Sequence, residues 1–163
     1  MTSSGADMLQ AALEYVHRGW SVLPLIPGTK RPLTEKGFYD ATTDEAQIQG
    51  WWTQHPLANI GIRVGLESNL FVLDVDNKGG KNGSAELERL EKQYGALPPT
   101  RIVRTPTGGF HYYFKFPTEF RDKPLKKELA PGIDLKVNGY VVAPPSIILE
   151  LDDCYAIVTE DPQ

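Results

Sequence analysis

The chain has 163 residues, and 40% of them are hydrophobic, which is enough for the core of a single domain spanning residues 1–163. The formal net charge of −4 excludes a uniformly basic surface. It does not exclude a nucleic-acid partner, because basic residues cluster locally at Lys30–Arg31, Lys78–Lys81 and Lys123–Lys127.

The cysteine count and the hydropathy pattern narrow the class of protein further. One cysteine, Cys154, allows neither an internal disulfide framework nor a thiolate zinc cluster. No apolar run reaches the roughly 18 residues that span a bilayer. The N-terminal stretch also lacks the basic start and apolar core of a secretory signal. We therefore expect a soluble, cytoplasmic protein with no membrane partner.

The first half of the chain alternates between helical and extended patterns. Apolar residues at helical spacing predict a helix over 7–18, and cap candidates Thr43 and Asp44 open a second helix that closes at Pro56. A third helix is predicted over 82–95. Strands are expected within 21–27, 59–65 and 69–76.

The second half is rich in strands and predicts a mainly antiparallel arrangement. The extended runs are "RIVRT", "FHYYFKF", "GIDLKV", "YVVA" and "YAIV". Helices and strands that alternate first and are then followed by consecutive strands favour an α+β architecture over a doubly wound parallel sheet. Within "FHYYFKF", one of Tyr112 and Tyr113 is expected to enter the core while the other lies on the opposite face.

Two carboxylates in "FVLDVDN" are the first candidates for chemistry. Alternate residues of a strand share a face, so Asp74 and Asp76 point the same way and repel unless a cation lies between them. Mg²⁺ or Mn²⁺ suits such oxygen ligands. A strand end at which both acids reach water is the alternative.

A third carboxylate, Asp134, lies between Ile133 and Leu135 in another extended run. It either marks the solvent face of an antiparallel sheet or completes a cluster with Asp74 and Asp76. Three acids can hold two divalent ions roughly 4 Å apart, an arrangement suited to nucleotidyl transfer.

The stretch "TPTGGFHYYF" has two adjacent glycines and a histidine at the start of a strand. Backbone N–H groups of Thr107, Gly108 and Gly109 could form a nest for an anion, with His111 beside it. An inert histidine on the surface of the strand is the alternative. A nucleotide triphosphate fits both the nest and the acids, and the glycines are then expected to let phosphate touch the backbone.

These motifs resemble those of bifunctional primase–polymerase (prim-pol) domains of phage and plasmid replication proteins, in the archaeo-eukaryotic primase superfamily. The resemblance covers "GWSVLPLIPGTKRPL", "ATTDEAQIQGWW", "ANIGIRVG", "FVLDVDNKGG", "TPTGGFHYYF" and "GIDLKVNGYVVAPPS". It implies an RRM-like antiparallel half beside a smaller α/β half, with the active site in a cleft between them. Thr107 stands where the family often has serine, and the set of cysteines and histidines that binds zinc in some primases is missing, so no zinc is expected.

The resemblance also implies roles for individual residues. Asp74, Asp76 and Asp134 would be catalytic and would bind two Mg²⁺ or Mn²⁺ ions. His111 and the Thr107-Gly108-Gly109 turn would hold the phosphates of the incoming nucleotide. Further nucleotide-binding candidates are Lys136, Lys30 and Arg63.

The function expected from this resemblance is template-directed nucleotidyl transfer by a DNA primase, a DNA polymerase or both, in phage or plasmid replication. Its partners would be a single-stranded DNA template with a primer, deoxyribonucleotides or ribonucleotides, and a helicase domain or protein. Location in the host cytoplasm follows if a phage encodes the chain. Two alternatives are a non-catalytic DNA-binding initiator module and a phosphatase that uses the Asp-x-Asp pair.

Overall fold

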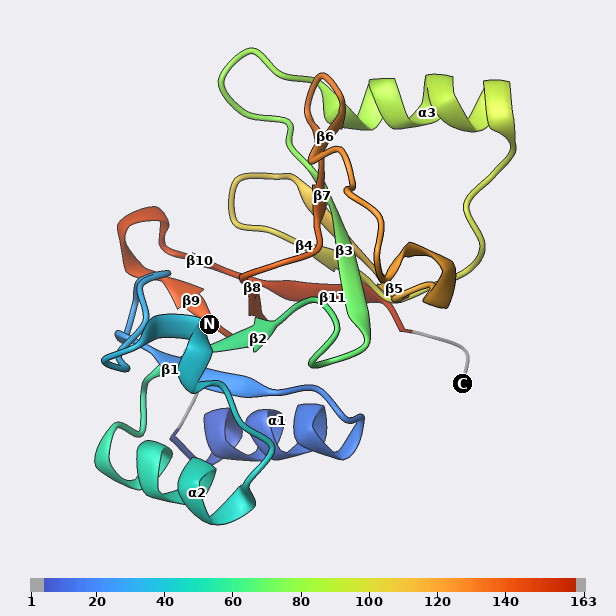
Figure 1. Ribbon diagram of the computed structural model, residues 1–163. Coiled ribbons are helices and arrows are strands. Elements are labelled where there is room, and N and C mark those ends of the chain that lie inside the picture. The colour runs from blue at the N-terminus through green and yellow to red at the C-terminus, as the bar shows by residue number, and fades with distance from the viewer. Residues whose placement is uncertain (1–4, 161–163) are drawn as a thin grey trace.

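The computed structural model describes residues 5–160, which form three α-helices and several antiparallel sheets (Figure 1). The predicted α+β class is therefore confirmed. Within these residues, no helix is both long enough and apolar enough to cross a membrane. The α-helices are α1 (Gly5–His17), α2 (Glu45–Gln54) and α3 (Gly83–Tyr94). Short 3-10 helices are η1 (Gly37–Asp40), η2 (Thr118–Phe120) and η3 (Leu149–Leu151).

A three-stranded antiparallel sheet forms one half of the molecule together with α1 and α2. Its order is β1-β2-β8, with β1 at Val22–Leu25, β2 at Asn59–Arg63 and β8 at Tyr140–Ala143. β1 is an edge strand, and an edge tolerates Pro24 because proline has no N–H to donate to a neighbouring strand. Figure 1 shows α1 and α2 together below this sheet, far from α3.

A six-stranded antiparallel sheet in the order β11-β4-β5-β3-β7-β6 forms the other half. Its strands in chain order are β3 (Leu70–Val75), β4 (Ile102–Arg104), β5 (Phe110–Lys115), β6 (Glu128–Ala130), β7 (Ile133–Lys136) and β11 (Ala156–Thr159). A separate pair consists of β9 (Ile147–Ile148) and β10 (Asp153–Cys154).

The two faces of β3 pack into different cores. Leu73 and Val75 belong to a small cluster with Leu87 of α3, whereas Val72 belongs to the main core with residues of α1, β1 and β2. Because side chains alternate along a strand, Asp74 lies on the same face as Val72. The face that carries Asp74 is therefore the one turned toward the smaller sheet.

The two adjacent tyrosines of β5 also point to opposite faces of the sheet. Tyr113 is only 3% exposed and belongs to the main core, while Tyr112 packs with the α3 cluster, as the alternation predicts. In α2, Trp52 is buried and donates its indole N–H to the carbonyl oxygen of Ala58 at 3.0 Å.

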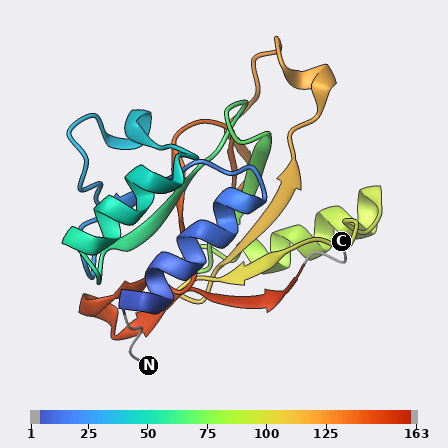
Figure 2. The same ribbon diagram turned by 90° about the horizontal axis from the view of Figure 1, so that it is seen from below.

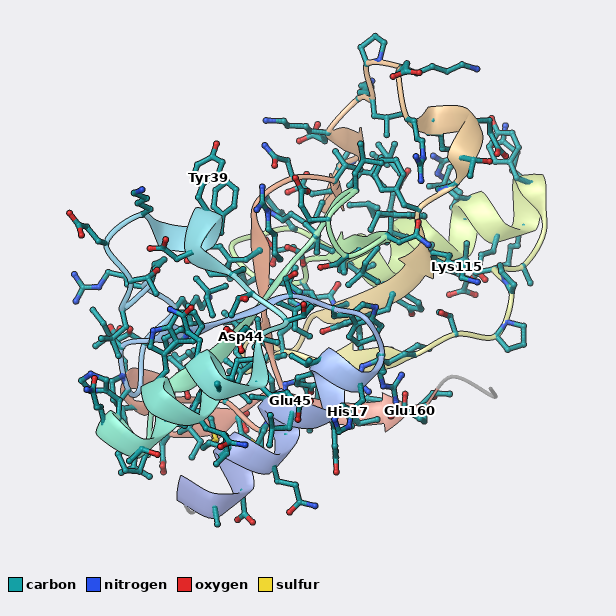
Figure 3. The ribbon with its side chains drawn as sticks, turned by 60° about the horizontal axis from the view of Figure 1, so that its bottom comes forward. His17, Tyr39, Asp44, Glu45, Lys115 and Glu160 are labelled. Atoms are coloured by element: carbon teal, nitrogen blue, oxygen red, sulfur yellow. The ribbon has the colours of Figure 1, made fainter. Side chains whose placement is uncertain are left out.

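Polar side chains fix the position of α2. Asp44 is the N-cap and accepts a hydrogen bond from the N–H of Ala46 at 3.0 Å, which satisfies a donor that the first helical turn leaves free. The helix also lies against the end of α1, where His17 Nε2 is 3.6 Å from Glu45 Oε1; Figure 3 labels both side chains.

Candidate active site

The register of the six-stranded sheet places three of the predicted site residues in one row. Asp74 in the central strand β3 lies directly opposite His111 of β5 on one side and Asp134 of β7 on the other. Directly opposed residues of an antiparallel pair have β-carbons about 4.5–5.5 Å apart on the same face. Asp134 is therefore on the same face as Asp74, and not on the far side of the sheet.

His111 lies deep in this row. Its side chain is 9% exposed, and its ring is 6.0 Å from the ring of Tyr155. Burial lowers the pKa of His111 to about 4, and the charges of Lys136 and Lys30 push it in the same direction. The imidazole is therefore neutral at neutral pH, with Nε2 3.6 Å from Asp74 Oδ1.

Asp74 is the carboxylate whose charge this environment destabilises most clearly. Burial raises its pKa; Lys136 opposes the rise, Asp134 and Asp76 add to it, and Lys30 opposes it. The carboxylate is thus near two like charges and two lysines. A cation bound between the carboxylates would relieve their repulsion.

Asp76 follows the last residue of β3, and its carboxylate is engaged by its own loop. Oδ1 accepts a hydrogen bond from the N–H of Lys78 at 3.0 Å, and Oδ2 is 3.6 Å from Lys81 Nζ. Among residues 5–160, no three histidine, cysteine or acidic side chains come together closely enough to hold a metal ion. The predicted three-carboxylate cluster is therefore not assembled in this structure.

The Thr107-Gly108-Gly109 turn does not form the predicted anion nest. The N–H of Gly108 donates to the carbonyl oxygen of Thr105 at 3.0 Å, and the N–H of Gly109 donates to Thr105 Oγ1 at 3.1 Å. Both donors are consumed inside the turn because Thr105 offers it a backbone and a side-chain acceptor. Thr107 contributes its hydroxyl, 3.4 Å from Thr105 Oγ1.

The two glycines also have another reason than the one the sequence suggested. Gly108 has φ +82°, a left-handed conformation that residues with a β-carbon rarely adopt. A β-carbon on Gly109 would overlap the carbonyl oxygen of Val75 in β3. The close approach is therefore between two strands, and phosphate contact with the backbone is not needed to explain these glycines.

Two lysines predicted from the resemblance lie near Asp74, and one arginine does not. Lys136 is opposite Val72 on the Asp74 face, and both Lys136 and Lys30 influence the pKa of Asp74 and His111. The Lys30 backbone is fixed by Tyr140, whose hydroxyl donates to the Lys30 carbonyl oxygen at 2.6 Å.

Arg63 is engaged elsewhere. Its Nη2 atom is 3.1 Å from Glu67 Oε1, and its guanidinium lies 5.4 Å from the ring centroids of Phe38 and Tyr39. No described contact brings it to Asp74, so its predicted role in nucleotide binding gains no support.

Sequence reasoning missed two residues that shape this site. Asn77 donates from Nδ2 to the carbonyl oxygen of Gly108 and to Ser84 Oγ, so it ties the glycine turn to the start of α3. An asparagine directly after the Asp-x-Asp pair is a signal that could have indicated such a brace. Tyr155 packs beside His111 and is 4% exposed; burial raises its pKa, and the Asp74 charge adds to the rise. Tyr155 lies between β10 and β11, and a tyrosine at such a position carries no comparable signal.

Comparison with known proteins agrees with the motifs. The family model described as bifunctional DNA primase/polymerase, N-terminal, matches residues 12–163. None of the curated proteins matches the chain. Such a family generally implies nucleotidyl transfer with DNA and nucleotides as substrates. Because the matched region covers nearly the whole chain, the protein belongs to the bifunctional DNA primase/polymerase (N-terminal) family.

Proposed function

We propose that the chain is the catalytic domain of a template-directed DNA primase, DNA polymerase or both, acting in phage or plasmid replication. Its substrates are a primed single-stranded DNA template and deoxyribonucleotides or ribonucleotides, and a helicase domain or protein works beside it. The observation that carries this proposal is the row of His111, Asp74 and Asp134 across three neighbouring strands, with Lys136 and Lys30 close to it.

The proposed substrate cleft lies on the Asp74 face, between the six-stranded sheet as an RRM-like half and the three-stranded sheet as the smaller half. Asp74 is partly accessible, with its side chain 28% exposed, whereas Val72 two residues earlier is fully buried. The sheet face therefore passes from core to solvent at Asp74, which is where a substrate can reach it.

The carboxylate oxygens at this site are chemically suited to a divalent metal ion. Asp74 and Asp134 are opposed carboxylates, and hard cations such as Mg²⁺ and Mn²⁺ take oxygen ligands. Asp76 would be the third ligand if its carboxylate gave up the N–H of Lys78 and the exposed Lys81, whose contact with it is a weak surface ion pair. When bound, the ions supply the positive charge that activates the primer 3′-hydroxyl and stabilises the departing pyrophosphate.

The remaining site residues bind the nucleotide and position the catalytic carboxylate. Lys136 and Lys30 attract the triphosphate, and the Thr107 hydroxyl is a further donor at the glycine turn. The neutral ring of His111, packed on Tyr155, holds the Asp74 carboxylate in place from the β5 side. In this proposal catalysis is mainly positioning and electrostatic stabilisation, with no strong general base among the side chains.

Primer extension by purified variants tests the proposal. Asp74→Asn and Asp134→Asn each keep the size of the side chain and remove its charge, so extension with Mg²⁺ or Mn²⁺ is expected to fall at least ~100-fold. The matched control is Glu88→Gln, a change at a 70% exposed carboxylate on α3, and it should extend primers like the wild type.

Extension at the wild-type rate by Asp74→Asn would refute the catalytic role. Retained DNA binding by that variant would then favour the non-catalytic DNA-binding module. Thermal melts of each variant separate loss of activity from loss of folding.

A further inference from the structure

The connection between β5 and β6 carries an unusual group of cations. We call residues 118–127 the basic arm. Its seven residues 121–127 include four cations and one carboxylate, Asp122, in a chain whose formal net charge is −4. Glu119 and Glu128 flank the group. The four cations are Arg121, Lys123, Lys126 and Lys127.

The arm is exposed and its cations are not neutralised. All four cationic residues are exposed, and none of them makes an ion pair within residues 5–160. By contrast, the exposed cations Arg89 and Lys92 of α3 are each paired with a glutamate on the same helix. Figure 2 shows the arm projecting from the body of the molecule at the top of the view.

The arm begins and ends on strands of the site. The connection that leads into the arm leaves β5 at Lys115, which Figure 3 labels, and β5 is the strand that carries His111. It returns beside β7, where the Lys127 carbonyl oxygen accepts the N–H of Leu135 at 2.6 Å. The next residue, Glu128, lies opposite Asp134. The Lys127 end of the arm is therefore one strand away from the proposed catalytic row.

We propose that the basic arm is a binding site for the sugar–phosphate backbone of the DNA strand that occupies the proposed active site, an inference that rests on the proposed function. Exposed lysines and arginines bind phosphates as charges and release condensed counterions, without reading base sequence. Contact with the arm then keeps the primed template in the site while each nucleotide is added.

The salt dependence of DNA binding tests this inference. The probe is a fluorescent oligothymidine single strand, titrated at several salt concentrations without divalent ions or nucleotides. Lys126→Gln with Lys127→Gln should weaken binding and make the plot of log K against log salt shallower by up to about 1.4, since each lost phosphate contact removes about 0.7 on a single strand. Arg121→Gln with Lys123→Gln should act in the same direction.

Two control variants make the result specific. Arg89→Gln with Lys92→Gln removes the same number of charges from α3 and should leave the slope unchanged. Lys126→Arg with Lys127→Arg keeps the charges and should keep the wild-type slope. In primer extension, the Lys126 and Lys127 glutamine variant should raise KM for the primed template several-fold and leave kcat unchanged.

The outcomes separate this inference from the proposed function. An arm variant with the wild-type slope, or an equal loss in the α3 control, overturns the role of the arm whether or not the wild type extends primers. Absence of oligothymidine binding by the wild type overturns it as well. A shallower slope confined to the arm variants supports DNA binding by the arm even if Asp74→Asn retains extension, which is the result that refutes the proposed catalytic function.

Discussion

Gly108 and Gly109 are neighbours in one turn, but different physical constraints require each of them. Gly108 has a positive φ and nothing within 4 Å of the place where a β-carbon would lie. Gly109 has an ordinary φ but faces the carbonyl oxygen of Val75, which belongs to the backbone of β3 and cannot move without breaking the sheet.

Alanine substitutions should therefore differ in cost. Gly108→Ala is expected to lower the free energy of unfolding by about 1 kcal/mol, the cost of a left-handed conformation for a residue with a β-carbon. Gly109→Ala is expected to cost on the order of 3 kcal/mol, because overpacking shifts β3 away from β5. Urea unfolding measures both, and equal costs for the two variants would contradict the close-approach explanation.

The sequence predicts which types of residue a site contains better than it predicts their hydrogen-bond partners. Alternation along "FVLDVDN" predicts that Asp74 and Asp76 share a face, but β3 ends at Val75, before Asp76. Alternation could not show that the Asp76 carboxylate turns to the N–H of Lys78, or that the Thr105 hydroxyl captures the N–H of Gly109. Such hydrogen bonds depend on local loop geometry, which residue spacing does not encode.

Arg101 joins several elements of the fold at one buried point. Its side chain is 2% exposed, and its guanidinium lies 5.2–6.0 Å from the ring centroids of Tyr15, Trp20 and Tyr113. One nitrogen is 2.8 Å from Glu160 Oε2, and another donates to the hydroxyl of Tyr15 at 3.0 Å. α1, the start of β4 and β5 therefore meet at this planar, charged group.

Arg101→Lys should be costly although it keeps the charge. An ammonium group lacks the planar fork that stacks on rings and donates in two directions, so the free energy of unfolding is expected to fall by about 2 kcal/mol. The matched variant Arg89→Lys changes an exposed arginine on α3 and should stay within about 0.5 kcal/mol of the wild type. Similar urea midpoints for the two variants would show that the stacking contributes little.

Elements could be predicted where local signals mark them. Asp44 begins α2 as a capping residue, and the three predicted helices correspond to α1, α2 and α3 within a few residues. The order of the strands within each sheet could not be predicted from the sequence. Pairing of β3 with β5 and β7 joins segments far apart in the chain, and it is this register that sets Asp134 beside Asp74. The residue pattern left this contact as one of two alternatives, and the family resemblance favoured it.

For the whole molecule, the main core joins the two sheets into one packed body. It contains Leu23 and Ile60 from the smaller sheet and Val72 from the larger one, so the halves are expected to unfold together. Tyr15, Tyr113 and Tyr155 are also in this core, and each hydroxyl is kept protonated by burial.

Burial raises the pKa of Tyr113 to about 12, and it raises the pKa of Tyr15 and Tyr155 as well. Between pH 10 and 12 the unfolded chain loses these protons while the folded chain keeps them, so the unfolded state binds fewer protons and stability falls as the pH rises. Each such tyrosine contributes a slope of about 1.4 kcal/mol per pH unit, which urea unfolding at a series of alkaline pH values can measure. Tyr113→Phe should reduce that slope by the contribution of one tyrosine. Tyr94→Phe, at a residue that is 77% exposed, should leave the slope unchanged. If Tyr113→Phe and the wild type lose stability in parallel above pH 10, the Tyr113 hydroxyl is titrating in the folded protein as it does in water, and the tight closure of the core around it is wrong.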